Sequence, residues 1–504
     1  MRRGYLHIGH AKAALLNDYF AHEEYKGTLL CRFDDTNPSK EKEEFQTAIV
    51  EDLALMGIHP DKTSFTSDYF EELYQYCIKV IKDGNAYCDD TEQEKMKHER
   101  WHGIKSERRD SSVAENLDRF EEMKKGSTEG VRWCVRAKIS VDDPNKALRD
   151  PVIYRCNPEK HHRTGDTWKI YPTYDFCCPI VDSIEGVTHA LRTIEYRDRN
   201  AQYEWMIKAL NLRRVHIWDF ARMNFIRVVL SKRKLTKIVE NGVAWGWDDP
   251  RFPTIRGIRR RGMTIPALRE FILKQGPSRN IVNLDWTTFW ATNKKYIDPV
   301  APRHTSIVEE HAVKATVRGA RVAHYTEDKP KHGKNPEIGT KKVAYSDEIL
   351  IEQVDAQNFA QDEEITLMNW GNAIVRKINH SLNPLNRKLV TGLELELHLQ
   401  GDVKTTKQKI TWLSVKGQEL IPVELVDFDY LITKDTLEEG DQLEDFLNPD
   451  TEFRTKVVAD CNVTDLQEND IIQFERKGYF RVDRAFKHGE PAVMFNIPTG
   501  KGGK

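Results

Sequence analysis

Hydrophobic and polar positions divide the chain into stretches with different periodicities. Up to about residue 95, segments with a helical repeat alternate with short apolar runs. The pattern predicts a helix over 8–19, a strand over 28–33 and a helix over 40–56. Ser67 is placed to cap the next helix. Alternation of this kind favours a parallel α/β sheet, and the same character returns over 171–219.

Between residues 91 and 168 the charge is dense and the periodicity weakens, which indicates an insertion that splits the α/β domain. The stretch 235–298 is predicted to be mostly helical. Its clearest helix begins at a Thr264 cap and reaches Lys274, before Gly276 and Pro277 end it.

After Pro299 the pattern changes to a period of two. Four leucines alternate with polar residues over 393–400, as expected for a half-buried strand. Further strands of this kind predict a largely β module of one or two barrels over the last 200 residues or so. Residues 324–342 are rich in Lys, Pro and Gly and are expected to form an exposed loop. Residues 499–504 are expected to form a disordered tail.

Composition adds few constraints to this outline. The chain has 504 residues, 39% hydrophobic and 31% charged, with a net charge of −2, so we expect several soluble domains. A polyanion would have to bind through local basic patches. None of the eight cysteines forms a C-x-x-C pair, which disfavours a structural zinc site and suits reduced thiols. No apolar run is long enough to predict a membrane span or a signal peptide.

Two short motifs carry the strongest chemical signal. His7-Ile8-Gly9-His10 places two imidazoles about one helical turn apart, with a residue lacking Cβ between them. A nucleotide could then lie close to a helix start, with ring N–H groups reaching its phosphates. Leu230-Ser231-Lys232-Arg233 follows a strongly apolar run and supplies a cation that could stabilise charge developing on a phosphate chain.

Other candidates have a structural and a functional interpretation. Asp34 and Asp35 suit a turn after the strand, or the capture of a substrate ammonium at the end of a parallel strand. The aromatic run 171–176 suits a core or a pocket wall. Arg192, in apolar surroundings, could be a surface residue or a planar fork for a carboxylate.

The densest basic cluster is made of Arg256, Arg259, Arg260 and Arg261. It can be a solvated loop or a contact to a nucleic-acid backbone, and the sequence leaves both interpretations open.

The two signature motifs resemble those of the class I aminoacyl-tRNA synthetases. Within that class, three segments look like the glutamyl/glutaminyl branch: 32–38 (RFDDTNP), 171–176 (YPTYDF) and 229–235 (VLSKRKL). The resemblance extends to about Asp483. The β-rich C-terminal part is similar to the anticodon-binding barrels of the eukaryotic and archaeal type. The chain therefore looks like a eukaryotic cytosolic member.

The resemblance implies a Rossmann-like α/β catalytic domain with an inserted acceptor-binding domain, a helical segment and C-terminal all-β anticodon-binding barrels. The boundaries expected are 1–95 and 169–234 for the catalytic halves, 96–168 for the insertion, 235–299 for the helical part, 300–495 for the barrels and 496–504 for the tail.

The same resemblance implies the site. The catalytic residues would be His7, His10 and Lys232. The residues around ATP would be His7, Gly9, His10, Glu195, Val229, Leu230, Ser231, Lys232 and Arg233. The glutamate-binding residues would be Asp34, Tyr174, Asp175, Phe176, Cys177, Cys178 and Arg192. No residue is assigned to a protein-bound metal.

The activity implied is a glutamate–tRNA ligase. Glutamate would attack the α-phosphate of ATP, accompanied by Mg²⁺, and tRNA(Glu) would then accept the glutamyl group. The resemblance aligns Arg192 with the residue that faces the end of the substrate side chain, where the glutaminyl branch has an uncharged residue. An arginine would pair with a carboxylate and leave an amide unsatisfied.

The match departs from the family at Met1-Arg2-Arg3-Gly4, where a strand and a Pro-rich turn are expected. The expectation is therefore an N-terminally truncated chain, without the additional domain through which relatives could join a synthetase complex. The alternatives are a glutaminyl ligase, a catalytically inactive tRNA-binding remnant, and a small-molecule adenylyltransferase.

Overall fold

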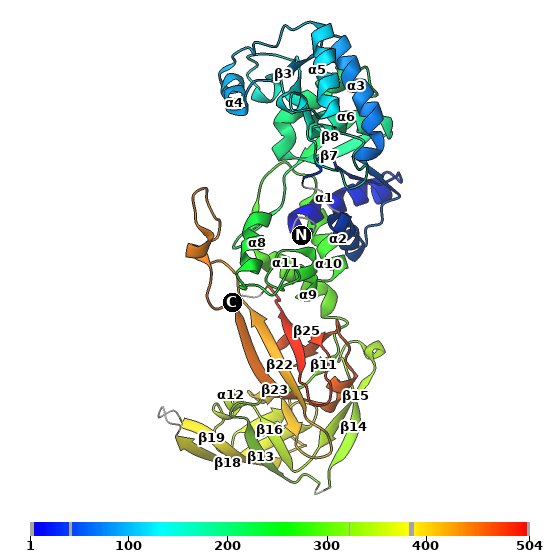
Figure 1. Cartoon of the computed structure of the whole chain (residues 1–504). Helices are drawn as coiled ribbons and strands as arrows, with labels where there is room; N and C mark the ends of the chain where they lie inside the picture. Colours follow the sequence, from blue (N-terminus) through cyan, green and yellow to red (C-terminus); the bar gives the residue numbers. More distant parts are fainter. Residues whose placement is uncertain (1–4, 40–42, 322, 383–387, 501–504) are drawn as a thin grey trace. The chain divides into compact units, whose positions relative to one another are not determined.

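The computed structural model describes residues 5–39, 43–321, 323–382 and 388–500. The chain forms two compact units (Figure 1). The first contains Met1–Asn224 and Ile272–Asn283, and the second contains Phe225–Phe271 and Leu284–Lys504. Residues 1–4, which include Arg2 and Arg3, and 501–504 of the expected tail lie outside the described residues.

The first unit begins with a β-α-β arrangement. Helix α1 (Ile8–Asp18) continues as a short π-helix (Tyr19–Glu24), and then strand β1 (Leu30–Phe33), helix α2 (Glu43–Leu55) and strand β2 (Lys62–Phe65) follow. Strands β1 and β2 are parallel, in the register Leu30↔Lys62 to Phe33↔Phe65. The predicted helix over 8–19 and the strand over 28–33 are thus confirmed.

A second parallel pair contains β7 (His189–Thr193) and β8 (His216–Phe220). The connection between them contains the 3-10 helix Ile194–Arg199 and helix α7 (Asn200–Ala209), while helix α6 (Tyr174–Ile184) precedes the pair. The expected parallel pairing is present, although the described residues arrange it as two separate two-stranded sheets.

The stretch expected to be an insertion, 96–168, lies between the outer strands of an antiparallel four-stranded sheet in the order β3-β4-β5-β6, so that the sheet extends beyond the expected bounds on both sides. The strands of the sheet are β3 (Ala86–Asp89), β4 (Cys134–Ala137), β5 (Val152–Cys156) and β6 (Ile170–Pro172), and the helices of this part of the chain are α3 (Phe70–Lys82), α4 (Gln93–His102) and α5 (Val113–Lys125). One face of α3 points inward, because Phe70, Leu73, Cys77 and Ile81 are all buried in one core.

The predicted capping role of Ser67 is wrong. Tyr69 precedes α3, and Ser67 lies in the 3-10 helix Thr66–Tyr69. Its backbone N–H and hydroxyl both donate to the buried carboxylate of Asp35, at 2.8 and 2.6 Å. The carboxylate competes for the serine because a buried charge must be hydrogen-bonded.

The second unit opens with helices and continues with strands. The helices are α8 (Lys232–Glu240), α9 (Ile255–Arg260), α10 (Ile265–Gln275, which continues into the first unit), α11 (Trp286–Ile297) and, later, α12 (Gln353–Ala356). The predicted helix after Thr264 corresponds to α10. The two-residue strands β9 (Asn224–Phe225) and β10 (Asn283–Leu284) lie where the chain passes between the units.

Two seven-stranded sheets make up the β module. One has the order β20-β17-β18-β19-β13-β16-β21, and the other has the order β11-β24-β25-β26-β22-β23-β12. The strands of the first are β13 (Val313–Arg318), β16 (Glu348–Ile351), β17 (Glu364–Leu367), β18 (Gly371–Leu382), β19 (Lys388–Leu397), β20 (Lys409–Ile410) and β21 (Trp412–Ser414). The strands of the second are β11 (Arg303–His304), β12 (Ser306–Val308), β22 (Ile421–Phe428), β23 (Glu452–Ala459), β24 (Ile471–Phe474), β25 (Gly478–Arg484) and β26 (Ala492–Ile497).

Two details of the β module differ from expectation. Residues 324–342 are not a loop, because β14 (Tyr325–Pro330) and β15 (Thr340–Tyr345) form an antiparallel hairpin within and just beyond them. The leucine alternation is confirmed at Leu393 and Leu395, but β19 ends at Leu397 and Leu399 is 57% exposed. Within the described ranges, every helix is too short or too polar to span a lipid bilayer.

Candidate active site

His7 and His10 are held together at the start of α1. His7 caps the helix, since its Nδ1 accepts from the Gly9 N–H at 3.1 Å, while the His7 N–H donates to Nδ1 of His10 at 3.2 Å. The ring centroids lie 3.7 Å apart. A Cβ on residue 9 would meet the His7 ring at 3.0 Å, so glycine keeps this pair close. The arrangement presents two imidazoles at the positive end of a helix, where phosphate binds well.

Helix α1 is anchored by a residue that the sequence analysis did not single out. The ammonium of Lys12 is buried and donates to the carbonyl oxygen of Ala221 at 2.6 Å. Burial lowers the pKa of Lys12. The lysine fixes the helix that carries the histidine pair.

Arg192 lies near the end of β7, with only 8% of its surface exposed. Its guanidinium lies over the rings of Tyr174, Tyr196 and Tyr203, at 5.7, 5.1 and 5.5 Å from their centroids. Its Nε is buried and has no hydrogen-bond partner in the part of the chain that the structure describes. Among the described residues no carboxylate forms an ion pair with it. A buried cation that packs against aromatic faces is a suitable partner for a ligand carboxylate.

The predicted run 174–178 begins α6 and divides into two groups. Tyr174 and Cys178 line the same cavity as Arg192. Phe176 and Cys177 are buried in the hydrophobic core beneath. Burial, with a smaller contribution from the Asp182 carboxylate, raises the pKa of the Cys178 thiol to about 12. Cys178 is therefore protonated at neutral pH and adds an uncharged side chain to the wall of the cavity.

Asp34 and Asp35 have different environments after β1. The carboxylate of Asp35 is buried and is held by Ser67, while its carbonyl oxygen lies 2.7 Å from Nε2 of His161. Asp34 is exposed, yet its pKa is raised, chiefly because the surrounding protein partly desolvates its carboxylate. Asp34 is thus the one of the two that can meet a ligand.

The sequence analysis did not find an ionic network whose members Arg32, Asp182 and Glu185 line the cavity that includes Arg192. Arg32 donates to Glu185 at 2.5 Å and also to Asp182. The hydroxyl of Tyr203 donates to Asp182 at 2.7 Å, and that of Tyr69 donates to Glu185 at 3.0 Å. Burial alone would lower the pKa of Arg32, but the partner carboxylates raise it overall. This network joins β1 to α6 and orients Tyr203 under Arg192.

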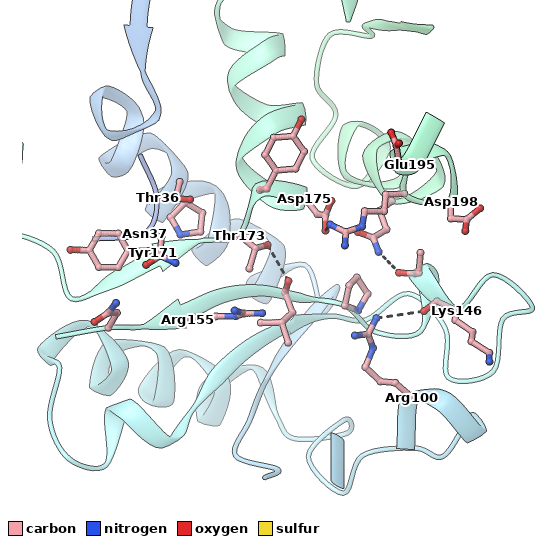
Figure 2. A pocket seen from close by; sticks show the side chains of 18 of the residues that line it. Thr36, Asn37, Arg100, Lys146, Arg155, Tyr171, Thr173, Asp175, Glu195 and Asp198 are labelled. Atoms are coloured by element: carbon pink, nitrogen blue, oxygen red, sulfur yellow. Dashed lines mark hydrogen bonds and ion pairs between the residues drawn. The ribbon is translucent and has the colours of Figure 1, made fainter. Parts of the chain in front are cut away.

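Two cavities of the first unit adjoin these residues. One, with a volume of 1120 Å³, lies between β1, α6 and β7 and includes Arg192. The other, with a volume of 1180 Å³, extends to the insertion. Figure 2 shows Arg100, Lys146 and Arg155 on its lower side and Asp175, Glu195 and Asp198 on its upper side. The cations on the lower side of this cavity suit phosphate groups, and the carboxylates lie on the opposite side.

Asp175 and Glu195, both predicted site residues, line this second cavity and have cationic partners. Asp175 forms an ion pair with Arg199 at 3.0 Å, and Glu195 forms one with Arg222 at 2.9 Å. The predicted placement of Glu195 near ATP has no direct counterpart among these contacts and stays a prediction.

The second motif lies in the second unit. Val229 is buried against Leu235 in the local core, Ser231 precedes α8, and Lys232 is its first residue. Leu230 is half-buried and Arg233 is exposed. The chain thus passes from buried Val229 to exposed Ser231 and Arg233 within this motif.

The basic cluster at 256–261 is not a loop, because Arg256, Arg259 and Arg260 belong to α9 and Arg261 follows as its C-cap. A contact of the cluster to a nucleic-acid backbone stays a prediction. Arg260 forms a bidentate pair with Asp483 at 2.8 Å and a second pair with Asp248. Arg261 donates to the Phe428 carbonyl oxygen, and its burial lowers its pKa to about 10. These arginines fasten the helix to β-strand residues.

The sequence matches three known families along its length. Residues 2–299 match the catalytic domain of tRNA synthetases class I (E and Q). Residues 301–390 and 409–483 match two anti-codon binding domains of the same group.

Curated relatives cover nearly the whole chain. A "Probable glutamate--tRNA ligase, cytoplasmic" of Schizosaccharomyces pombe is 62% identical over 99% of this chain and 69% of its own length. A "Glutamate--tRNA ligase, cytoplasmic" of Saccharomyces cerevisiae is 60% identical over 99% of this chain and 69% of its own length. A solved glutamate tRNA ligase from Elizabethkingia meningosepticum is 17% identical, covering 58% of this chain and 67% of its own, with a TM-score of 0.43, a likeness too weak to carry an argument.

Proposed function

The chain belongs to the class I tRNA synthetases of the E and Q type, and we propose that it is a glutamate–tRNA ligase. The observation that supports glutamate best is Arg192, a buried guanidinium without a carboxylate partner among the described residues, in a cavity shared with Tyr174 and Cys178. A substrate γ-carboxylate would pair with it, whereas the glutamine amide would leave its charge uncompensated.

We propose that glutamate binds with its γ-carboxylate at Arg192 and its ammonium at Asp34. Its α-carboxylate then attacks the α-phosphate of ATP, forming a C–O–P linkage as pyrophosphate leaves. His7 and His10 would hold the phosphates at the start of α1, and Lys232 would balance the charge that develops on them. Mg²⁺ would enter as part of the nucleotide substrate.

In the second step, a ribose hydroxyl at the end of tRNA(Glu) takes the glutamyl group and AMP leaves. We propose that the acceptor end enters the cavity of Figure 2, where Arg100, Lys146 and Arg155 provide cations from the insertion. The β module would read the anticodon, in keeping with the families that it matches.

The expected domain boundaries follow the same assignment, with the insertion at 96–168 and the anticodon module at 300–495. The relatives named cytoplasmic suggest the cytoplasm as the site of action. A partner in a synthetase complex remains a proposal, which the bifunctional glutamate/proline ligases among the relatives make reasonable.

Replacing Arg192 with cysteine tests the proposal. We expect glutamate charging to fall by at least ~100-fold, because a charge-assisted pair is lost, and glutamine charging to rise relative to it. Initial rates of tRNA charging with each labelled amino acid give the ratio. Arg214→Ala, at an exposed arginine outside both cavities, is the control. An unchanged glutamate-to-glutamine ratio in Arg192→Cys would count against the assignment.

A further inference from the structure

Arg192 and Asp219 occupy neighbouring positions on two parallel strands. They are register partners on β7 and β8, so their side chains leave the sheet on the same face. Both are buried, with 8% and 5% of their surface exposed. Opposite charges so placed would ordinarily pair directly, yet the described residues show no such ion pair.

Asn200, the first residue of α7, separates the two charges. Its Nδ2 donates to both carboxylate oxygens of Asp219, at 2.9 and 3.0 Å. Because these contacts require the amide nitrogen on the Asp219 side, they fix the amide orientation. Its Oδ1 therefore faces Arg192 and accepts from Nη1 at 3.4 Å.

This arrangement gives each charge a neutral partner. Asp219 accepts from an amide donor, and Arg192 donates a long, weak hydrogen bond to an amide oxygen. The three tyrosine rings stabilise the guanidinium through their faces without neutralising it. No described residue thus cancels the positive charge of Arg192, and its Nε has no hydrogen-bond partner among the described residues.

We propose that Asn200 is a specificity-determining positioning residue, which keeps the Asp219 carboxylate away from Arg192 and so preserves the preference for a substrate carboxylate. The inference rests on the proposed function, because it assumes that the γ-carboxylate of glutamate meets Arg192. It adds that Arg192 discriminates glutamate from glutamine only while the neutral side chain of Asn200 separates it from Asp219.

The test is a double-mutant cycle. Asn200→Ala removes the separator, so Asp219 loses its donors and competes for Arg192. We expect the KM for glutamate to rise ~10-fold, the typical effect of losing a charged hydrogen bond. The KM for ATP should not change, and kcat should change less than the KM for glutamate. Asn200→Ala combined with Asp219→Asn removes the competing charge and should recover most of the glutamate KM.

Charging of tRNA is measured at varied glutamate for the unaltered chain, both variants, and Asn358→Ala, which removes an exposed asparagine in the β module. Equal impairment of the single and double variants, or an unchanged KM for glutamate in Asn200→Ala, would overturn the inference. If Asn200→Ala fails to fold, Asn200→Asp provides the second comparison. It places a carboxylate beside Arg192, and an unchanged KM for glutamate there would contradict the inference. Absence of glutamate charging by the unaltered chain would instead refute the proposed function.

Discussion

At the scale of single residues, the site depends on partners that sequence spacing does not reveal. Arg192 could be singled out from its apolar surroundings. Asn200 and Asp219 could not, because their roles arise from the register of β7 on β8 and from the start of α7. The network of Arg32, Asp182 and Glu185 was missed because Arg32 lies 150 positions from Asp182 and 153 from Glu185.

Arg155 is exposed in the cavity of Figure 2 and should contact tRNA phosphate. Arg155→Ala should raise the KM for tRNA several-fold, leave the KM for glutamate unchanged, and reduce the salt dependence of tRNA binding by a slope of ~1. Binding measured across a salt series gives that slope. An unaltered salt slope would exclude a phosphate contact, and Arg214→Ala is again the control.

Asp460 should control acid stability in the β module. It is buried, and it accepts from the Thr305 N–H at 2.6 Å and from Asn462 Nδ2 at 2.7 Å, with His304 beside it. Burial alone would raise its pKa, but His304, the charge of Lys341 and the Thr305 N–H lower it overall. A folded pKa below the unfolded value stabilises the protein above pH ~4, and this stability is lost as the pH falls through the folded pKa.

Asp460→Asn should therefore lower the free energy of unfolding by ~2 kcal/mol near neutral pH, and the difference from the unaltered chain should shrink below pH ~4. Urea unfolding at several pH values measures both effects. Asp450→Asn, at an exposed carboxylate, should change neither. A difference independent of pH would mean that the charge of Asp460 is not responsible.

At the scale of elements, a helix with a clear apolar face and a terminating glycine was predictable, as α3 illustrates, which ends at Lys82 just before Gly84. The hairpin of β14 and β15 was not, because its strands alternate little between apolar and polar residues and pair with each other. Helix α9 was obscured by its arginines, because the pairing of Arg260 with Asp248 and with Asp483, which lies far along the chain, is visible only in the structure.

Helix α9 also offers a prediction about packing. A Cβ on Gly257 would collide with the carbonyl oxygen of Asp249 and lie 2.8 Å from that of Phe252. Because backbone atoms must move, Gly257→Ala should lower the free energy of unfolding by ~2 kcal/mol or more. Gly333→Ala, where nothing lies within 4 Å, is the matched control. Equal thermal midpoints for the two variants would show that the helix accommodates the methyl group.

At the scale of the whole molecule, the class of fold was predictable. An α/β part followed by a β part produces two distinct periodicities along the sequence, and the motifs identified the family. Each of the two units has cores of its own. The histidine pair and the Lys232 segment belong to different units. The assignment of both motifs to ATP binding rests on the family resemblance, whereas the argument for glutamate rests on the contacts of Arg192.

The most direct test of the central claim is to charge total eukaryotic tRNA with labelled glutamate and, separately, with labelled glutamine, using the chain as printed. We predict charging with glutamate and no charging above background with glutamine, because Arg192 requires a carboxylate. Charging with glutamine, or no charging with either amino acid by folded protein, would contradict the claim.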